Sequence, residues 1–592
     1  MSNKKATNMK YPKKTAKDLV MSSFSGIDTD GYSHPAVSRE GIHASESQNL
    51  RITQEGSLLK REGFKLLSSA PSSIRAIWSG NIEGILRSYI LCKDTLYSLD
   101  VESGNYTKIG NVDTSSGNAH MIYYVDSIYI FDGSYIYRLK NDEISLDFGY
   151  APLIADNWTN TFLGTINEPR NAICNFARYT YTVSSVVTPV LRTAYKVASV
   201  KAAFVNGEPI DLSRCAPTDF TEAVTVQDLK EGDRVELHVC LEDDSTVYKE
   251  LASSIGGMVY GKMTDSVMLL HTSDKNRIYF SRIVDYSSLK ASDTAFSGGS
   301  LYIPFDNIKT VGDGRYGISA IHRHYDRLLV FTEGETWMAD TDFADTKDIL
   351  PTMTINASVG SPSLYGVCMA ENTPLSVSRD GIYLFTTDTD TFDECNAQRI
   401  SAPVDHLIKN FLPNTACTLT DRKRREVFIT MKDSEGKSLW LIYNTALRTF
   451  YRFLCPAADK LLYVGNKVGF IQGEKIYVFD DTLSVDLPNG ENGENELIEG
   501  YYVTNIHDLG SHDIKHISSI SASYDLTDGK IKLGMECDGE KQLSATLYPK
   551  EDHSHLTYKH RISSGRIKTV RLVAIFTGCG RQSLHGITLE VR

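Results

Sequence analysis

Several kinds of residue and motif are scarce in this 592-residue chain, and each shortage narrows its function. Tryptophan occurs only four times, which leaves few of the aromatic platforms that sugar sites often use. The ten cysteines form no Cys-x-x-Cys pair and no zinc-finger spacing, so we expect them to be small buried hydrophobes in a reducing compartment. No stretch approaches the roughly 20 apolar residues of a membrane helix. The lysine-containing start has no apolar segment of the kind that marks a secretory signal.

Charge is present but unevenly distributed. The chain has 74 acidic and 62 basic residues and a net charge of −12, although residues 1–20 carry +5 from six lysines and Asp18. The remaining body, at −17, argues against a broad DNA-gripping surface, because DNA binding requires Lys and Arg to neutralise phosphates. The basic arm is either a solvated tail or a segment that orders on a partner protein. Its candidate docking residues are Lys4, Lys5, Lys10, Lys13, Lys14 and Lys17.

Short alternating runs of β-branched and aromatic residues predict an all-β chain. Residues 127–139 read SIYIFDGSYIYRL, and Asp132-Gly133 between two such runs predicts a hairpin because Gly tolerates the positive φ of a tight turn. Comparable runs turn at Ser103-Gly104, Glu333-Gly334 and Asp380-Gly381, whereas helical periodicity is nearly absent. Quasi-repeated meanders of this kind predict an irregular β-propeller built from four-stranded blades.

Two segments interrupt this pattern and predict separate β-sandwiches, one inserted in the propeller and one at the C-terminus. We therefore divide the chain into five parts. These are a basic N-terminal arm (1–24), the first part of the propeller (25–169), the inserted sandwich (170–261), the second part of the propeller (262–482), and an acidic linker with the C-terminal sandwich (483–592).

An acidic run lies between the propeller and the C-terminal sandwich. Residues 480–500 contain seven acids and no base. Such a run is typical of a solvated linker, and the alternative is an acidic loop at the bore or gate of a channel. The acids of this candidate gate loop are Asp480, Asp481, Asp486, Glu491, Glu494, Glu496 and Glu499.

Three other clusters are candidates for chemistry. His322, His324 and Asp326 alternate and would share one face of a strand, as metal ligands can, although solvent-facing imidazoles explain them more simply. A second group contains His553, His555 and His560. The basic run 422–425 would suit a phosphate or an acidic partner, but a charged hairpin turn is the favoured interpretation. No Gly-x-Ser-x-Gly elbow and no phosphate loop is present, and we select no metal ligand, cofactor-binding residue or specific DNA-binding residue.

The N-terminal region carries a family resemblance. Residues 46–52 read ESQNLRI and residues 56–63 read GSLLKREG, which places Asn49, a Gly56 turn and Arg61-Glu62-Gly63 in one hairpin. This pattern resembles the opening of phage tail hub or tail nozzle proteins, among them the packaged-DNA-stabilising tail factors and tail tubular proteins of short-tailed phages. Weaker matches are NRIYFSRIVD at residues 276–285 and the segment of residues 360–385, which ends in DGIYLF. The resemblance extends over about residues 24–479.

The resemblance implies a structural virion protein without catalytic residues or cofactors. It implies a homohexameric ring in the phage tail, assembled in the host cytoplasm and docked below the portal and adaptor, that retains packaged DNA and conducts it during ejection. Acidic walls would suit this, because they repel phosphates and let double-stranded DNA pass without specific binding. The alternative is a propeller that binds or cleaves host-surface glycan, for which a carboxylate pair among the 74 acids would be needed.

Overall fold

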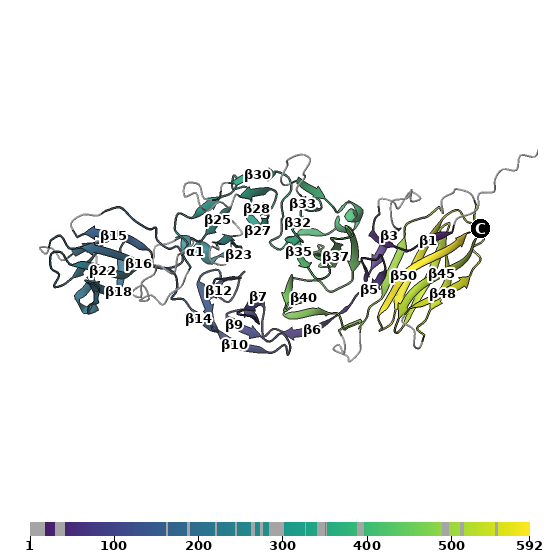
Figure 1. Ribbon diagram of the computed structural model, residues 1–592, viewed down its shortest axis with the longest axis horizontal. Coiled ribbons are helices and arrows are strands. Elements are labelled where there is room, and N and C mark those ends of the chain that lie inside the picture. The colour runs from purple at the N-terminus through teal and green to yellow at the C-terminus, as the bar shows by residue number, and fades with distance from the viewer. Residues whose placement is uncertain are drawn as a thin grey trace, which may run out of the picture.

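The computed structural model is elongated, with a β-propeller ring between two β-sandwiches (Figure 1). Among the described residues, strands predominate and only two α-helices occur, α1 (Thr246–Ala252) and α2 (Asp405–Ile408). The all-β class predicted from the sequence is therefore confirmed. No described helix is long and apolar enough to cross a membrane. The structure describes residues 18–29, 42–160, 164–185, 190–218, 222–242, 246–261, 267–272, 276–282, 301–325, 327–339, 350, 352–386, 396–487, 496–508, 514–550 and 555–591.

The described strands form seven four-stranded units that make up the ring. We number these units blades 1 to 7. The first strands of successive blades lie side by side, from β7 beside β11 to β35 beside β39. Blades 1 to 3 consist of β7 (Ile74–Ile82), β8 (Ile85–Cys92), β9 (Thr95–Leu99) and β10 (Tyr106–Asn111); β11 (His120–Tyr124), β12 (Ser127–Phe131), β13 (Ile136–Lys140) and β14 (Glu143–Ser145); and β23 (Ser254–Tyr260), β24 (Val267–Thr272), β25 (Arg277–Phe280) and β26 (Ile308–Thr310).

The predicted hairpins form within these blades and the next ones. Asp132-Gly133 joins β12 to β13, with Gly133 at a φ of 101° that only glycine adopts easily. Blades 4 to 6 consist of β27 (Ile318–His324), β28 (Arg327–Thr332), β29 (Thr336–Ala339) and β30 (Thr352–Asn356); β31 (Val367–Ala370), β32 (Thr373–Val377), β33 (Ile382–Thr386) and β34 (Asn396–Arg399); and β35 (Leu412–Asp421), β36 (Glu426–Lys432), β37 (Ser438–Asn444) and β38 (Thr449–Phe453).

Blade 7 closes the ring with a strand from the other end of the sequence. Its outer strand is β6 (Gly63–Ser69), which pairs antiparallel with β41 (Lys475–Asp480) beside β40 (Lys467–Gln472) and β39 (Lys460–Val464). Phe64 of β6 lies 5.3 Å from the ring of Phe470 and 5.7 Å from that of Tyr477, centroid to centroid. The N-terminal part of the chain thus seals a propeller whose last blade is made nearly 400 residues later.

The C-terminal sandwich also contains N-terminal strands. Its first sheet has the order β4-β5-β50-β45-β48, with β1 on β50, and its second is continuous with blade 6 through β2, β3, β44, β49, β46 and β47. The bounds are β1 (Leu19–Met21), β2 (Phe24–Ile27), β3 (Ile42–Gln48), β4 (Leu50–Ile52), β5 (Leu58–Lys60), β44 (Gly500–Thr504), β45 (Ile517–Leu526), β46 (Lys530–Cys537), β47 (Glu540–Leu547), β48 (Leu556–Arg561), β49 (Val570–Thr577) and β50 (Gln582–Val591).

These pairings correct the predicted first part of the propeller. The region that we assigned to 25–169 contributes β2 to β5 to the C-terminal sandwich, and its contribution to the ring begins only at β6. The physical reason is that an alternating strand pattern shows which side chains are buried, but not which sheet buries them.

The inserted sandwich lies between blades 2 and 3, but its limits differ from the predicted 170–261. It begins with β15 (Leu153–Thr159), whose Trp158 lies in the insert's core, and it ends with β22 (Arg234–Leu241). Residues 254–260 form β23 of blade 3 instead. The remaining strands are β16 (Phe176–Thr182), β17 (Val190–Arg192), β18 (Val197–Val205), β19 (Glu208–Pro209), β20 (Cys215–Pro217) and β21 (Ala223–Val226).

The aromatic cluster around Phe470 provides a test of how blade 7 is held. Phe470 is fully buried and contacts Phe64, Tyr477 and Trp440 at centroid distances of 5.3, 4.9 and 5.2 Å. We expect Phe470→Ala to lower the free energy of unfolding by about 3–5 kcal/mol, because it leaves a cavity in a closed core. Ile85→Ala, at a side chain that is 58% exposed, is the control and should change it by less than about 0.5 kcal/mol. Urea unfolding followed by tryptophan fluorescence measures both, and equal effects would contradict the packing described.

Candidate functional site: a buried ionic seam

The residues that carry the family resemblance lie where the propeller meets the C-terminal sandwich. The β4–β5 hairpin belongs to the sandwich, and three residues after Lys60 the chain enters β6 of blade 7. Gly63 makes this crossing possible, since a Cβ added there would lie 1.8 Å from the carbonyl oxygen of Val485. We call this junction the seam. It consists of Asn49, Arg51, Arg61, Glu62, Glu426, Tyr451 and Asp486.

Asn49 and Arg61 hold together three separate parts of the chain. Asn49 adopts a left-handed φ of 54°, and its Oδ1 accepts from Arg61 Nε at 2.9 Å and from the backbone N–H of Leu454 at 2.8 Å. Its Nδ2 donates to the carbonyl of Glu499 at 3.0 Å. Arg61 is 2% exposed and forms a two-pronged ion pair with Asp486 at 2.8 and 2.5 Å. Hairpin, blade 6 and linker are thereby fixed to one guanidinium.

A second buried arginine connects the same hairpin to blade 6. Arg51 donates to both carboxylate oxygens of Glu62, at 2.9 and 2.6 Å, and pairs with Glu426 of β36. Tyr451 of β38 donates its hydroxyl hydrogen to the same Glu426. The guanidinium of Arg51 also lies over the ring of Phe453 at 4.9 Å. The charges are thus buried but mutually compensated, as buried ions must be.

The seam strongly favours the charged form of Glu62. Burial alone would raise the pKa of the Glu62 carboxyl, but the guanidinium groups of Arg51 and Arg424 outweigh burial and lower this pKa to about 2. A network of this kind is a structural joint: it fixes the relative position of two domains rather than presenting a reactive group.

The structure divides the predicted acidic gate loop. Asp480 pairs with Lys467 at 2.6 Å, Asp481 pairs with Lys423 at 2.9 Å, and Asp486 is a member of the seam. These three acids therefore lie at the domain junction and are matched by bases elsewhere in the chain. Glu496, in the short β43 (Glu496–Leu497) that pairs with β42 (Val485–Asp486), and Glu499 are exposed. Glu491 and Glu494 lie outside the described residues, as do the six lysines of the basic arm.

The basic run 422–425 forms the turn between β35 and β36, as the favoured interpretation predicts. Arg424 donates to Asp421 at 2.7 Å and also pairs with Asp481, while Arg425 pairs with Glu371 at 2.7 Å. Much of this positive charge is therefore used within the chain and holds blade 6 to the start of the linker.

The first predicted histidine group does not form a three-residue metal site among the described residues. His324 is buried against Tyr325, with ring centroids 4.8 Å apart, and no described residue joins it and His322 as a third metal ligand; Asp326 lies outside the described residues. Burial lowers the pKa of His322 to about 4, and that of His271 in blade 3 also to about 4. These rings are neutral core groups at neutral pH.

Of the second group, only His555 enters a cluster that suits a metal. His560 stacks on Tyr558 at a centroid distance of 6.1 Å, and His553 lies outside the described residues. His555 instead lies beside Asp525 and His585, two residues that the sequence analysis did not select. Both are outward-facing members of alternating strands, and only the pairing of β45 with β50 and β48 reveals their proximity. This trio is, among the described residues, the one group of three such side chains close enough to share an ion.

Comparison with known proteins gives no assignment. No family model and no curated protein matches the chain. Similar solved structures include U3-55K, with 8% identity over 71% of this chain and 99% of that one and a TM-score of 0.32. The WD40 domain of SCAP from fission yeast has 9% identity, coverages of 76% and 98% and a TM-score of 0.30. An exo-β-1,3-galactanase from Phanerochaete chrysosporium has 8% identity, coverages of 56% and 95% and a TM-score of 0.22. At these scores the likenesses carry no functional inference.

The seam predicts a strong effect of removing one ion. We expect Arg61→Ala to cost about 3–5 kcal/mol of unfolding free energy, because Asp486 would remain buried without its partner. The control is Arg425→Ala, which breaks an exposed pair with Glu371 and should cost at most about 1 kcal/mol. The double variant Arg61→Met/Asp486→Asn removes both charges and should recover much of the loss. A single-variant cost as small as the control's, in the same urea titration, would show that the seam is not a structural joint.

His271 predicts a pH dependence of propeller stability. The unfolded state binds a proton on this imidazole below about pH 6.5, whereas the folded state resists until its pKa of about 4, so stability falls as pH decreases between these values. We expect His271→Gln, which cannot take up the proton, to lose about 2 kcal/mol less than the wild type between pH 7 and 4.5. Urea midpoints at several pH values measure this, and parallel curves for the two proteins would refute it.

Proposed function

We propose that the protein is a structural component of a phage tail, a nozzle or hub subunit that forms a ring below the portal and adaptor. The observation that carries the proposal is that its tail-protein-like motif residues have mechanical roles. Asn49 joins three chain segments, and Arg61 binds Asp486 across the junction. At position 63, only glycine fits against the backbone of Val485. A conduit for DNA under pressure needs domains that do not move apart, and a satisfied buried network supplies such rigidity.

The charge distribution supports the same role. A body of net charge −17 repels DNA phosphates, so a bore lined by several copies would let double-stranded DNA slide rather than adhere. In this proposal Glu491, Glu494, Glu496 and Glu499 are the remaining candidates for an acidic loop at the bore. Asp480, Asp481 and Asp486 take the structural role described above.

The first described strand, β1, marks where the lysine-bearing segment joins the C-terminal sandwich. Leu19 of β1 pairs with Leu589 of β50, and the carboxylate of Asp18 accepts a hydrogen bond from the N–H of Val591 at 3.2 Å. The lysines of the arm therefore precede a strand fixed to the edge of the C-terminal sandwich. We assign that end of the molecule to contacts with an adaptor or a neighbouring subunit.

The proposal predicts a closed ring. Light scattering of the purified chain, with its tail partners present if required, should give a mass near six times the 65.9 kDa of one chain, and negative-stain images should show rings with a central opening. Replacing the six arm lysines by serine should weaken assembly with the partners, whereas replacing Lys201 and Lys230 of the insert and Lys249 of α1 should not.

Two results would contradict this function. One is a chain that stays monomeric with all its tail partners present. The other is release of reducing sugar from host-surface glycan that is abolished by one carboxylate substitution outside the seam, which would favour the glycan-cleaving alternative.

A further inference from the structure

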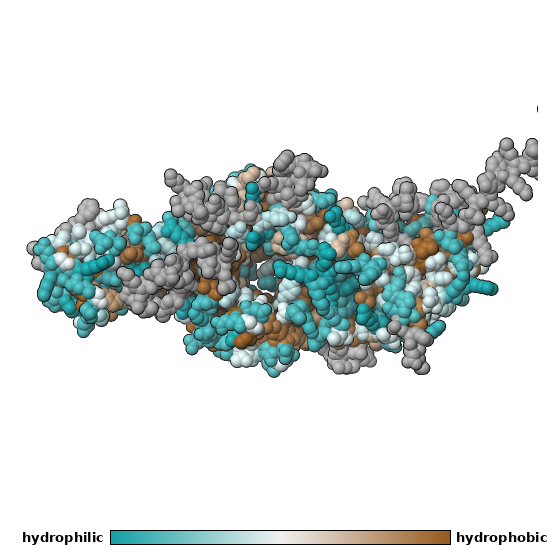
Figure 2. Space-filling view, in the orientation of Figure 1, coloured by the Kyte–Doolittle hydropathy of each residue, from teal (hydrophilic) through white to brown (hydrophobic). Residues whose placement is uncertain are grey.

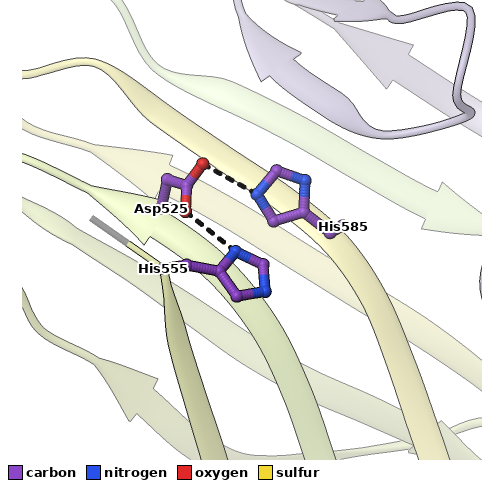
Figure 3. Close-up of side chains that lie close together, drawn as sticks. All are labelled: Asp525, His555 and His585. Atoms are coloured by element: carbon purple, nitrogen blue, oxygen red, sulfur yellow. Dashed lines mark hydrogen bonds and ion pairs between the residues drawn. The ribbon is translucent and has the colours of Figure 1, made fainter. Parts of the chain in front are cut away.

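Three side chains on the outer face of the C-terminal sandwich converge on a common point (Figure 3). Asp525 lies between two imidazoles, with Oδ1 3.2 Å from Nδ1 of His555 and Oδ2 2.9 Å from Nε2 of His585. The ligand atoms of all three lie within 4.8 Å of one another. In the space-filling view, the part of the molecule formed by the C-terminal sandwich shows hydrophilic residues interspersed with hydrophobic ones (Figure 2).

The strands position this trio through a local irregularity. Ser523 pairs with Gly586 while the next residue, Tyr524, pairs with Leu584, so His585 is an extra residue in β50. A bulge of this kind re-aims a side chain, and here it leaves His585 on the same outward face as Asp525. His555 directly precedes β48, which pairs with β45 on its other side. Strands β45 and β50 thus contribute one ligand each, and the third ligand comes from the residue directly before β48.

Each imidazole also contacts a serine hydroxyl through its second ring nitrogen. The second ring nitrogen of His585, Nδ1, lies 3.0 Å from the hydroxyl of Ser57, and the second nitrogen of His555, Nε2, lies 3.0 Å from the hydroxyl of Ser523. Histidines that bind metals commonly use their other nitrogen in this way, which fixes the tautomer and the ring orientation. A serine hydroxyl both donates and accepts, so it suits the ring with and without a metal.

The spacing suits a tetrahedral ion. Two ligands at the 2.0–2.1 Å of zinc bonds, separated by a tetrahedral angle, lie about 3.3 Å apart. The two nitrogen–oxygen separations, 3.2 Å to Oδ1 and 2.9 Å to Oδ2 of Asp525, are close to this value, and a small rotation of the carboxylate would present one oxygen to both imidazoles. Two imidazoles and one carboxylate are a ligand set that zinc accepts, with the fourth position left to water.

We propose that Asp525, His555 and His585 form a zinc-binding site that clips β45, β50 and the start of β48 together. Because His555 and Asp525 are 64% and 43% exposed, an ion can enter from solvent and keep a water ligand there. Through Ser57 the site also contacts the N-terminal hairpin that carries the seam. This inference is independent of the proposed function, since it concerns one chain and requires no ring.

The test is zinc binding by the full-length chain, with any affinity tag removed and bound metal stripped by chelator. Isothermal titration with ZnCl₂ at pH 7.5 should show one site per chain, and zinc should raise the melting temperature. Co²⁺ in place of zinc should give the visible absorption of a tetrahedral site.

Variants assign the ligands. We expect His555→Ala/His585→Ala to abolish the site and Ser57→Ala to weaken binding by about tenfold, as loss of a supporting hydrogen bond does. His560→Ala, in the strand β48 that follows His555 but stacked on Tyr558, is the matched control and should bind as the wild type does. Circular dichroism establishes that each variant is folded. Full zinc binding by the folded double variant, or none by the wild type at 100-fold molar excess of zinc, would overturn the proposal.

Discussion

The pairing of Arg61 with Asp486, together with the amide of Asn49, is the interaction on which the architecture depends. It lies where a single crossing of the chain leaves the C-terminal sandwich and enters the propeller. A guanidinium suits this place because its fixed fork satisfies a carboxylate, an amide and a carbonyl simultaneously. Burying the ion pair costs much desolvation free energy, so the pair is not an efficient source of stability. Either charge buried without its partner would destabilise the fold more. The pair therefore favours one arrangement of the two domains over all others.

This joint explains why the two ends of the chain are interleaved. The sandwich takes strands β1 to β5 from residues 19–60, and the propeller takes its closing strand from residues 63–69. Neither domain is complete without the N-terminal segment. The fold of each domain therefore depends on contacts between residues that are distant in sequence. The insert differs, since its strands pair only with each other and its core is separate. We expect it to behave as an appended unit whose loss leaves the ring intact.

The sequence predicted the kinds of element well and their partners poorly. Alternation and the turn at Asp132-Gly133 gave the hairpins, because both depend on residues close together in the chain. The division at residues 25 and 170 was wrong in detail, since no local pattern shows which sheet receives β4 or β15. The motif around Arg61 was recognised, but its partner Asp486, 425 residues away, was interpreted as part of a solvated loop. Of the zinc trio, only His555 was selected from the sequence, since Asp525 and His585 meet only across paired strands.

The central claim is that the seam makes the propeller and the C-terminal sandwich one cooperative unit. Native-state hydrogen exchange of the wild-type chain at increasing urea tests this most directly. We expect the amides of β41 and β50 to converge on one opening transition, while those of β16 and β22 in the insert open separately. If β50 opens at a lower urea concentration than β41 and never joins it, the two domains are independent and the claim is wrong.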